Sequence, residues 1–368
     1  MDTIRILHMA DMHLGSAVSM FEPTKNIIRR SEIEQSALRV FDMCKNADVV
    51  LMAGDIFDSG NCPTRIADMI ISKIKNCPRV RFFFSCGNHD PYNSFIVKYL
   101  IQNSPDNLHV FSTTAEYIEI KELKTGVWGA SFDGEYCPDS LLDPTLPCRR
   151  DYINLLCIHG ELTDGRSIYN PLSVSSMESM GFDYAALGHV HAFSGIKKSG
   201  KLSYAYCGVH EPNGFDECGE KGVVFGEIIG RELNFKFVPT ALRKYIDETL
   251  DITDIASYPA LIEQILQRCE NKNNICKINL VGNNSLGYAV NLDYIMNAAD
   301  CFSLTLSDET SLPIDFSAIC NDISLKGLCA VEILKRLENS SPEEKDQIRK
   351  SGAYLLDILD GRYDGFDY

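Results

Sequence analysis

The stretch that decides the fold covers residues 6–16 and reads Ile6-Leu7-His8-Met9-Ala10-Asp11-Met12-His13-Leu14-Gly15-Ser16. It closes a β-rich segment over residues 3–9 whose apolar residues alternate, which predicts a strand. Asp11 and His13 follow that strand and are two residues apart. Both can reach one ion only if the chain turns at the end of the strand. The stretch therefore predicts a strand that carries a carboxylate and an imidazole into a candidate metal site.

Apolar runs and helical patterns alternate after this stretch. Short buried strands are expected over residues 48–53 and 80–85, and helices over 26–46, 64–76 and 94–102. Strand signals are closely spaced from about 107 to 158, and they continue to about 238 after a helix over 172–180 and a strand over 183–187. This order predicts a layered α/β (α+β) fold, in which a sandwich of sheets is flanked by helices.

Five short motifs, each directly after an expected strand, carry the chemistry. They are Asp11-x-His13, Gly54-Asp55-x-x-Asp58, Gly87-Asn88-His89-Asp90, His159-Gly160 and Gly188-His189-x-His191. Each motif alone is weak evidence, because Gly, Asp and Asn also favour turns. Loops at the carboxyl ends of strands meet at one rim of a layered α/β fold. Together, the motifs therefore predict a single site.

The side chains of this site suit a pair of metal ions. The expected ligands are two carboxylates, one amide oxygen and four imidazoles: Asp11, Asp55, Asn88, His13, His159, His189 and His191. Such a mixed set favours Mn²⁺, Fe²⁺, Zn²⁺ or Co²⁺ over Mg²⁺; Mn²⁺ is the expected ion, and Mg²⁺ is kept as an alternative. Two ions about 3.5–4 Å apart clamp a phosphoryl group and lower the pKa of a shared water. We therefore expect hydrolysis of a phosphate ester.

Composition limits the range of substrates and architectures. A chain of 368 residues predicts two to three domains. It has 51 acidic and 35 basic residues, a net charge of −16, which is the wrong sign for simple electrostatic binding of nucleic acid. An anionic substrate must therefore be attracted locally, by the ions of the site. Lys25, Arg29 and Arg30 form a small basic group that we interpret as a solvated helix face.

The cysteines and the hydropathy pattern indicate a reducing compartment. Fourteen cysteines are scattered from Cys44 to Cys329 without a C-x-x-C pair, which argues against a disulfide scaffold and against a zinc site built from cysteines. No apolar run approaches the 18 residues of a membrane span. The first residues lack the pattern of a signal peptide. We expect a cytoplasmic protein that does not associate with membranes.

In their order along the chain, the five motifs resemble those of the calcineurin-like metallophosphoesterase superfamily, over roughly residues 3–230. The resemblance implies that Asp11, His13, Asp55 and His191 hold one ion and that Asp55, Asn88, His159 and His189 hold the other. It also implies that His89 faces the substrate and stabilises the transition state or protonates the leaving oxygen. Asp58 and Asp90 complete the candidate catalytic residues, and both are expected to orient the ligands. His8 is expected to pack near the site without binding metal.

Three further segments resemble the SbcD-type DNA repair exonucleases. They are residues 6–16, residues 87–92, and residues 208–217 with 219–222. The resemblance implies an exonuclease or endonuclease that acts on DNA together with an SbcC-like coiled-coil ATPase. It divides the chain into a nuclease domain (1–240), a small α+β cap domain that positions DNA (241–315) and a C-terminal helical segment that docks on the ATPase (316–368). Related nucleases dimerise, so a homodimer is also expected.

Alternatives stay open at this stage. The acidic charge favours a phosphatase or phosphodiesterase for nucleotides or other small phosphoesters. A metal-containing interaction subunit of an ATPase complex is a third function, although such a subunit has no need of His89. The C-terminal helices either dock on a partner or pack against their own domain. Their apolar positions are Leu328, Val331, Leu334, Leu337, Ile348, Leu355 and Ile358.

Overall fold

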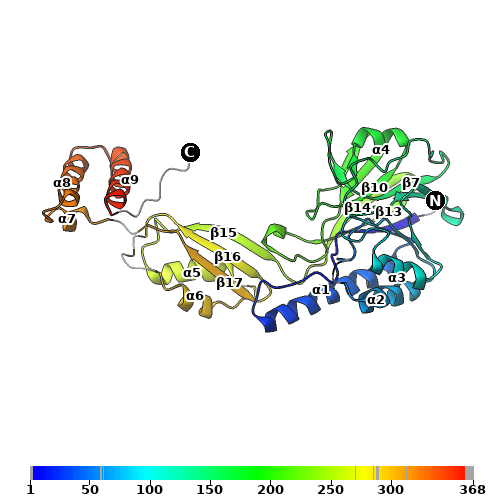
Figure 1. Ribbon diagram of the computed structural model, residues 1–368, viewed down its shortest axis with the longest axis horizontal. Coiled ribbons are helices and arrows are strands. Elements are labelled where there is room, and N and C mark those ends of the chain that lie inside the picture. The colour runs from blue at the N-terminus through cyan, green and yellow to red at the C-terminus, as the bar shows by residue number, and fades with distance from the viewer. Residues whose placement is uncertain are drawn as a thin grey trace. The chain divides into compact units, whose positions relative to one another are not determined.

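The computed structural model describes residues 3–58, 60, 62–269, 271–284, 286, 290–311 and 314–360. It forms two compact units (Figure 1). The first unit comprises Met1–Asp247, Asn271–Cys276 and Cys301–Ser303, and the second comprises Glu248–Glu270, Lys277–Asp300 and Leu304–Tyr368. The roles expected for residues 241–315 and 316–368 stay predictions. In the described part of the chain, no helix is long and apolar enough to cross a membrane.

The first unit contains two six-stranded sheets. One has the order β14-β13-β1-β2-β3-β4, with β1 to β4 parallel and with β13 antiparallel to both β1 and β14. Its strands are β1 (Thr3–Met9), β2 (Val49–Met52), β3 (Arg81–Phe84), β4 (Leu108–Val110), β13 (Gly222–Ile229) and β14 (Glu232–Pro239).

The other sheet has the order β11-β12-β10-β7-β6-β5. Its four central strands are parallel, and β5 and β11 are antiparallel at the two edges. Its strands are β5 (Glu116–Ile120), β6 (Thr125–Ala130), β7 (Ile153–His159), β10 (Tyr184–Gly188), β11 (Lys197–Ser199) and β12 (Leu202–Tyr206). A separate short pair joins β8 (Glu161–Leu162) and β9 (Pro171–Leu172).

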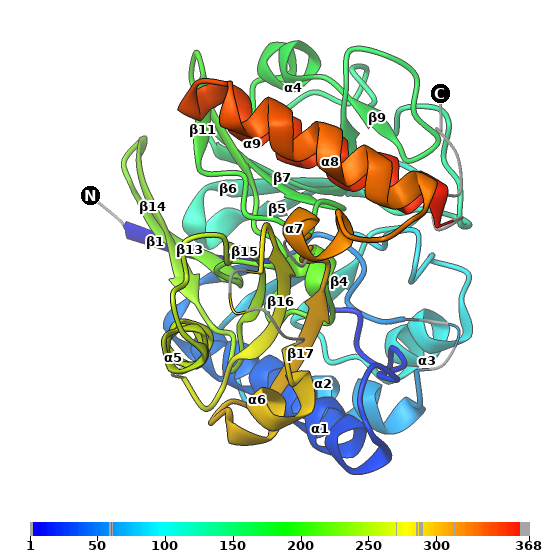
Figure 2. The same ribbon diagram turned by 90° about the vertical axis from the view of Figure 1, so that its left-hand side faces the viewer.

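Alternate residues of each strand face different layers. Ile6 and Leu51 of the first sheet pack between the sheets, together with Leu155 and Ala186 of the second. Their neighbours along the strands pack outward. α1 (Pro23–Met43), α2 (Thr64–Lys75) and α3 (Phe95–Asn103) cover the first sheet, and α4 (Val174–Met180) covers the second. Figures 1 and 2 show these helices on opposite sides of the sandwich, which confirms the expected layered fold.

The second unit combines most of a small sheet with helices. This sheet has the order β15-β16-β17, formed by β15 (Tyr245–Asp251), β16 (Ile275–Val281) and β17 (Ser303–Asp308), and the first residues of each strand belong to the first unit. α5 (Tyr258–Arg268) and α6 (Leu292–Ala298) belong to the same region, and α7 (Phe316–Ile319), α8 (Leu325–Glu338) and α9 (Pro342–Leu359) follow. The side chain of Ser324 caps α8, and a capping box at Ser341 begins α9.

Candidate functional site

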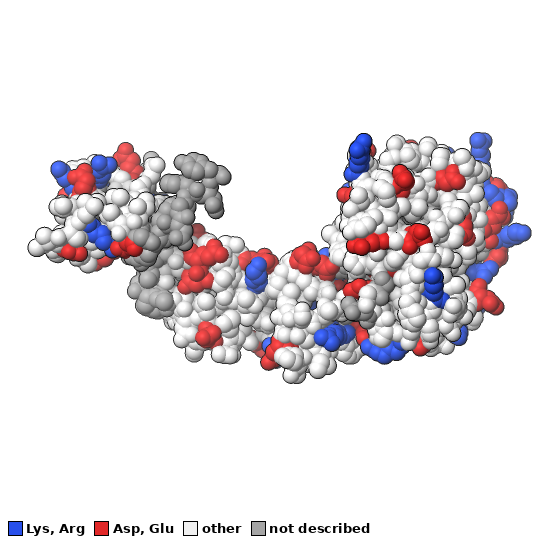
Figure 3. Space-filling model, viewed as in Figure 1, with Lys and Arg blue, Asp and Glu red and all other residues white. Residues whose placement is uncertain are grey.

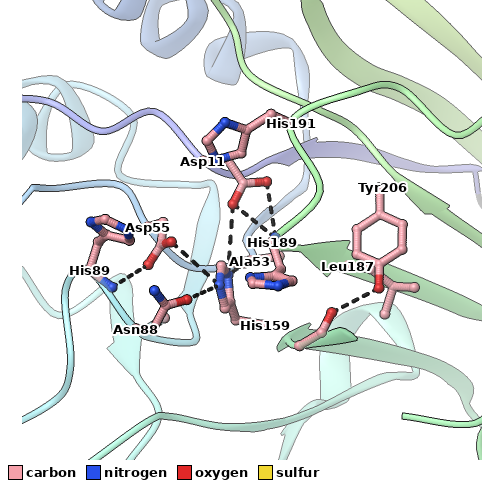
Figure 4. A network of polar contacts seen from close by, with 12 residues as sticks. Asp11, Ala53, Asp55, Asn88, His89, His159, Leu187, His189, His191 and Tyr206 are labelled. Atoms are coloured by element: carbon pink, nitrogen blue, oxygen red, sulfur yellow. Dashed lines mark hydrogen bonds and ion pairs between the residues drawn. The ribbon is translucent and has the colours of Figure 1, made fainter. Parts of the chain in front are cut away.

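The five motifs meet where the parallel strands of the two sheets end. Asp11 and His13 follow β1, Asp55 follows β2, and Asn88 follows β3. On the second sheet, His159 ends β7, and His189 and His191 follow β10. Figure 4 shows the side chains of Asp11, Asp55, Asn88, His159, His189 and His191 converging on one place, from loops that are far apart in the sequence.

Unusual backbone conformations bring the ligand atoms together. Asp11, His13, Asp55 and His189 all have positive φ, of 50°, 45°, 51° and 114°. Non-glycine residues rarely adopt this region, and such strain concentrates at functional sites. Hydrogen bonds hold the turns: the N–H of Asp11 donates to Gly54 O at 2.9 Å, and the N–H of His13 donates to Asp55 O at 2.9 Å. The backbone is therefore built around the placement of these side chains.

His13 and His191 face each other with Asp11 nearby. Their Nε2 atoms are 3.1 Å apart, and one ligand atom from each of the three residues lies within 4.8 Å of the others. His191 Nδ1 lies 2.5 Å from a Glu217 carboxylate oxygen and donates to it, so in the neutral ring Nε2 carries the lone pair. Two ligands about 2.1 Å from one ion are about 3.0–3.4 Å apart. The His13–His191 pair fits that spacing.

His159 forms the second half of the site. Its Nδ1–H donates to Ala53 O at 3.0 Å, which leaves a lone pair on Nε2. His159 Nε2 lies 3.0 Å from Asn88 Oδ1 and 3.4 Å from Asp55 Oδ2. These three atoms are all hydrogen-bond acceptors, so none of them can donate a hydrogen bond to another. A cation among them would satisfy all three, so these residues fit a metal ion.

Burial favours the neutral, metal-binding form of two of the imidazoles. It lowers the pKa of His13 to about 4 and the pKa of His189 to about 4. Burial also raises the pKa of Asp11 to about 7, although His159 and His191 oppose the shift. A divalent cation would favour the ionised form of Asp11.

His189 occupies the edge of this cluster. Its ring is 5.3 Å from the His159 ring, and its backbone N–H donates to Asp11 Oδ1 at 2.8 Å. His189 thus has two roles in the site: its ring lies beside His159, and its backbone N–H fixes the carboxylate of Asp11.

His89 stands at the open side of the site. Its side chain is exposed, and its ring lies 4.7 Å from the His13 ring. Its backbone N–H donates to Asp55 Oδ1 at 2.8 Å. A ring nitrogen of His89 also lies within 4.8 Å of ligand atoms of His13 and Asp55. Geometry alone therefore permits contact with either the substrate or an ion.

Asp90 and Asp58 differ in what they touch. The buried Asp90 carboxylate accepts N–H bonds from Asp55, Ile56, Phe57 and Gly87 at 2.7–3.0 Å, so it holds the Asp55 turn in place. Asp58 is half-buried and lines the same pocket as His89. Among the described residues, its carboxylate has no hydrogen-bond partner.

Glu217 is a site residue that the sequence analysis missed. It is buried and accepts from His191 Nδ1 at 2.5 Å and from the N–H of Asn213 at 2.6 Å. Burial opposes charge on both side chains, but their hydrogen bond raises the pKa of His191 and lowers the pKa of Glu217. Lys221 Nζ donates to His191 O at 3.0 Å. The segment 213–221 thus holds His191 from two sides, and its resemblance to the nuclease segment was the one available signal.

The prediction of a solvated basic face was wrong for Arg29. Its side chain is 0% exposed and lies 2.7 Å from Glu211, which is equally buried. Arg29 also donates to Pro212 O at 2.6 Å. This arginine therefore anchors the segment before Glu217 and is not available to a phosphate backbone.

His8 packs beside the site, as expected. Its Nε2–H donates to Leu187 O at 3.1 Å, and its Nδ1 accepts from Tyr184 Oη at 2.9 Å. Both ring nitrogens are occupied, so His8 has none left for a metal.

Known proteins share the sequence pattern of this site. The chain is 22% identical over 278 residues to the uncharacterized metallophosphoesterase YhaO of Bacillus subtilis (strain 168); the match covers 71% of this chain and 66%, just under two thirds, of that protein. A solved dimetal phosphatase from Danio rerio aligns with a TM-score of 0.37 and 12% identity, over 61% of this chain and 92% of that one. The family model of the calcineurin-like phosphoesterases matches residues 4–193. That match spans more than half of the chain and contains all five motifs in full, and the chain therefore belongs to the calcineurin-like phosphoesterases.

Proposed function

We propose that this phosphoesterase hydrolyses phosphodiester bonds in DNA and uses two divalent ions, with Mn²⁺ as the expected metal. One observation carries the chemistry: acceptor atoms of His159, Asn88 and Asp55 face one another beside the paired Nε2 atoms of His13 and His191. Asp11, His13, Asp55 and His191 would hold one ion, and Asp55, Asn88, His159 and His189 the other. When bound, the ions supply positive charge for the phosphoryl oxygens and lower the pKa of a water molecule.

Other residues of the chain orient the metal ligands and protonate the leaving oxygen. Asp90 fixes the turn that carries Asp55, and Glu217 fixes the tautomer of His191. His89 is the exposed imidazole of the pocket, and we assign it to the leaving oxygen, to which it donates a proton. General acid catalysis of this kind contributes roughly 10²- to 10⁴-fold.

DNA as substrate is supported by the segments that resemble SbcD-type nucleases. One of these segments, residues 208–217, supplies part of the pocket wall, including Asn213, Asp216 and Glu217. The pocket has a volume of about 390 Å³ and is open to one side of the ligand cluster. We expect a strand of DNA to enter this pocket beside His89, which is exposed.

A coiled-coil ATPase partner is supported by the helices α8 and α9. Leu328 is 70% exposed, and Val331, Leu355 and Ile358 are exposed as well. By contrast, Leu334, Leu337 and Ile348 pack against the small core around Phe316. The apolar side chains of these helices thus form an exposed group and a packed group. Only the exposed group, Leu328, Val331, Leu355 and Ile358, forms the proposed docking face.

Hydrolysis of small phosphoesters is the second candidate, and the net charge of −16 favours it. Figure 3 shows acidic and basic groups interspersed on the visible face, without a broad basic area. Long-range attraction of DNA would therefore be weak, and binding would rest on the site itself.

The decisive assay is degradation of end-labelled linear DNA by the purified chain with Mn²⁺, with Mg²⁺ and with chelator. Mn²⁺-dependent shortening that is absent in His89→Ala supports the proposal. Hydrolysis of bis(p-nitrophenyl) phosphate without DNA cleavage, even after addition of a coiled-coil ATPase, would favour small phosphoesters. Light scattering of the same samples tests the expected homodimer.

A further inference from the structure

Two tyrosine rings continue the site outward from His189. The Tyr169 ring lies 4.9 Å from the His189 ring, at an interplanar angle of 38°. The Tyr136 ring lies 6.2 Å from the Tyr169 ring, at 35°. Tyr136 is 56% exposed. The rings thus form a short series that leads from a predicted metal ligand to solvent.

The two tyrosines are tied to the ligand loops by backbone bonds. Cys137 N–H donates to Ile168 O at 2.7 Å, and Asn170 N–H donates to Cys137 O at 2.6 Å. Asn170 is buried at a φ of 48°, and its Nδ2 donates to His159 O at 2.6 Å. Hydrogen bonds therefore fix the segments that carry Tyr136 and Tyr169 to each other and to His159.

An open pocket of about 650 Å³ lies beside this pair. Its lining includes Tyr169, Ile168, Pro138 and Arg166. Ser167 Oγ donates a hydrogen bond to Glu161 Oε2 at 2.5 Å, so one oxygen of this carboxylate already has a donor. Arg166 is exposed and forms no ion pair with any described residue. The pocket lining therefore offers the Tyr169 ring and the Arg166 cation beside the carboxylates of Asp139 and Glu161, and the Tyr136 ring stands next to Tyr169 outside the lining.

We propose that Tyr136 and Tyr169 form a stacking platform for a nucleobase, on the His189 side of the metal site. The proposal rests on the proposed function, because the base must belong to a strand whose phosphate lies at the ions. Exposed aromatic rings bind bases of any sequence through their π faces, and arginine adds contacts to phosphate or base. A second pocket is lined by His13 and His89, and we assign it to the nucleoside on the other side of the diester.

The test compares two probes and two variants. The probes are a fluorescein-labelled tetranucleotide and an abasic tetramer with the same sugar–phosphate backbone. Tyr136→Leu keeps an apolar side chain but removes the ring, whereas Tyr136→Phe keeps the ring. Both probes carry fluorescein and phosphorothioate linkages that resist hydrolysis. Binding is followed by fluorescence anisotropy with Mn²⁺ present, and circular dichroism confirms that each variant is folded.

We expect Tyr136→Leu to weaken binding of the base-bearing probe by about five- to 150-fold, which corresponds to one lost stacking contact. Binding of the abasic probe should not change, and Tyr136→Phe should behave as the wild type. Equal binding of both probes by the wild type, or an equal loss for both probes in folded Tyr136→Leu, overturns the platform. If the wild type cleaves DNA in that case, the proposed function stands and only the platform fails.

Discussion

Substitution of Glu217 by glutamine tests how the site holds His191. The carboxylate accepts two N–H groups, one from His191 Nδ1 at 2.5 Å and one from Asn213 at 2.6 Å. Glutamine is isosteric but has a single oxygen, so one donor must face its NH₂ group. Loss of such a partner of a metal-binding histidine costs about 10- to 100-fold in metal affinity, or about 1.4–2.8 kcal/mol. Because His191 is predicted to bind one of the two ions, only one binding step should weaken.

Titration with Mn²⁺ by calorimetry measures both steps, and ¹⁵N NMR of the His191 ring reports its tautomer. Asp216→Asn is the matched control, because Asp216 lines the same pocket and is exposed. The expected result is one weakened step, a mixed His191 tautomer and an unchanged control. Unchanged binding by Glu217→Gln would refute the reasoning. An equal loss at both steps together with a lower melting temperature would indicate a merely structural role.

Three further predictions concern catalysis, pH and backbone strain. His89→Ala should keep both ions, as measured by elemental analysis, but lower kcat by about 10²- to 10⁴-fold; loss of an ion would make His89 a ligand. Burial lowers the pKa of His8 to about 3 from 6.5. The unfolded chain therefore takes up a proton below about pH 6.5 that the folded chain excludes, and the free energy of unfolding falls as the pH falls, by about 2 kcal/mol at pH 5. Urea unfolding at pH 8 and pH 5 should show that His8→Gln escapes this loss, and an identical pH dependence would contradict it. Gly54 has φ of +90°, and a Cβ there would lie 2.4 Å from His159 Nδ1. Gly54→Ala should lose stability, by at least about 1–3 kcal/mol, and bound metal, whereas Gly134→Ala, with open space around its Cβ, should lose neither.

The sequence was sufficient for the central layers and for the convergence of the motifs. Buried strands such as β2, with four fully apolar residues, have a clear signal, and a parallel sheet fixes where their carboxyl ends meet. The helix caps at Ser324 and Ser341 are equally local and were also predictable.

Other features depend on contacts between distant residues. The strand β15 was not expected, because only Tyr245 and Leu250 of its seven residues are buried. The helix α6 was not expected either, because it is only seven residues long. Arg29 reads as a surface residue until Glu211, 182 positions away, is placed beside it. Glu217 and Tyr136 owe their positions to loop geometry, which hydrophobic periodicity does not report.

The measurement that tests the central claim most directly is the number of Mn²⁺ ions bound per chain. The wild type should bind two ions at saturation, and Asp55→Ala should lose affinity at both positions, because Asp55 approaches both His13 and His159. The Asp216→Asn control should bind two. One ion per wild-type chain, or two ions bound undiminished by Asp55→Ala, would contradict the assignment of a dinuclear site.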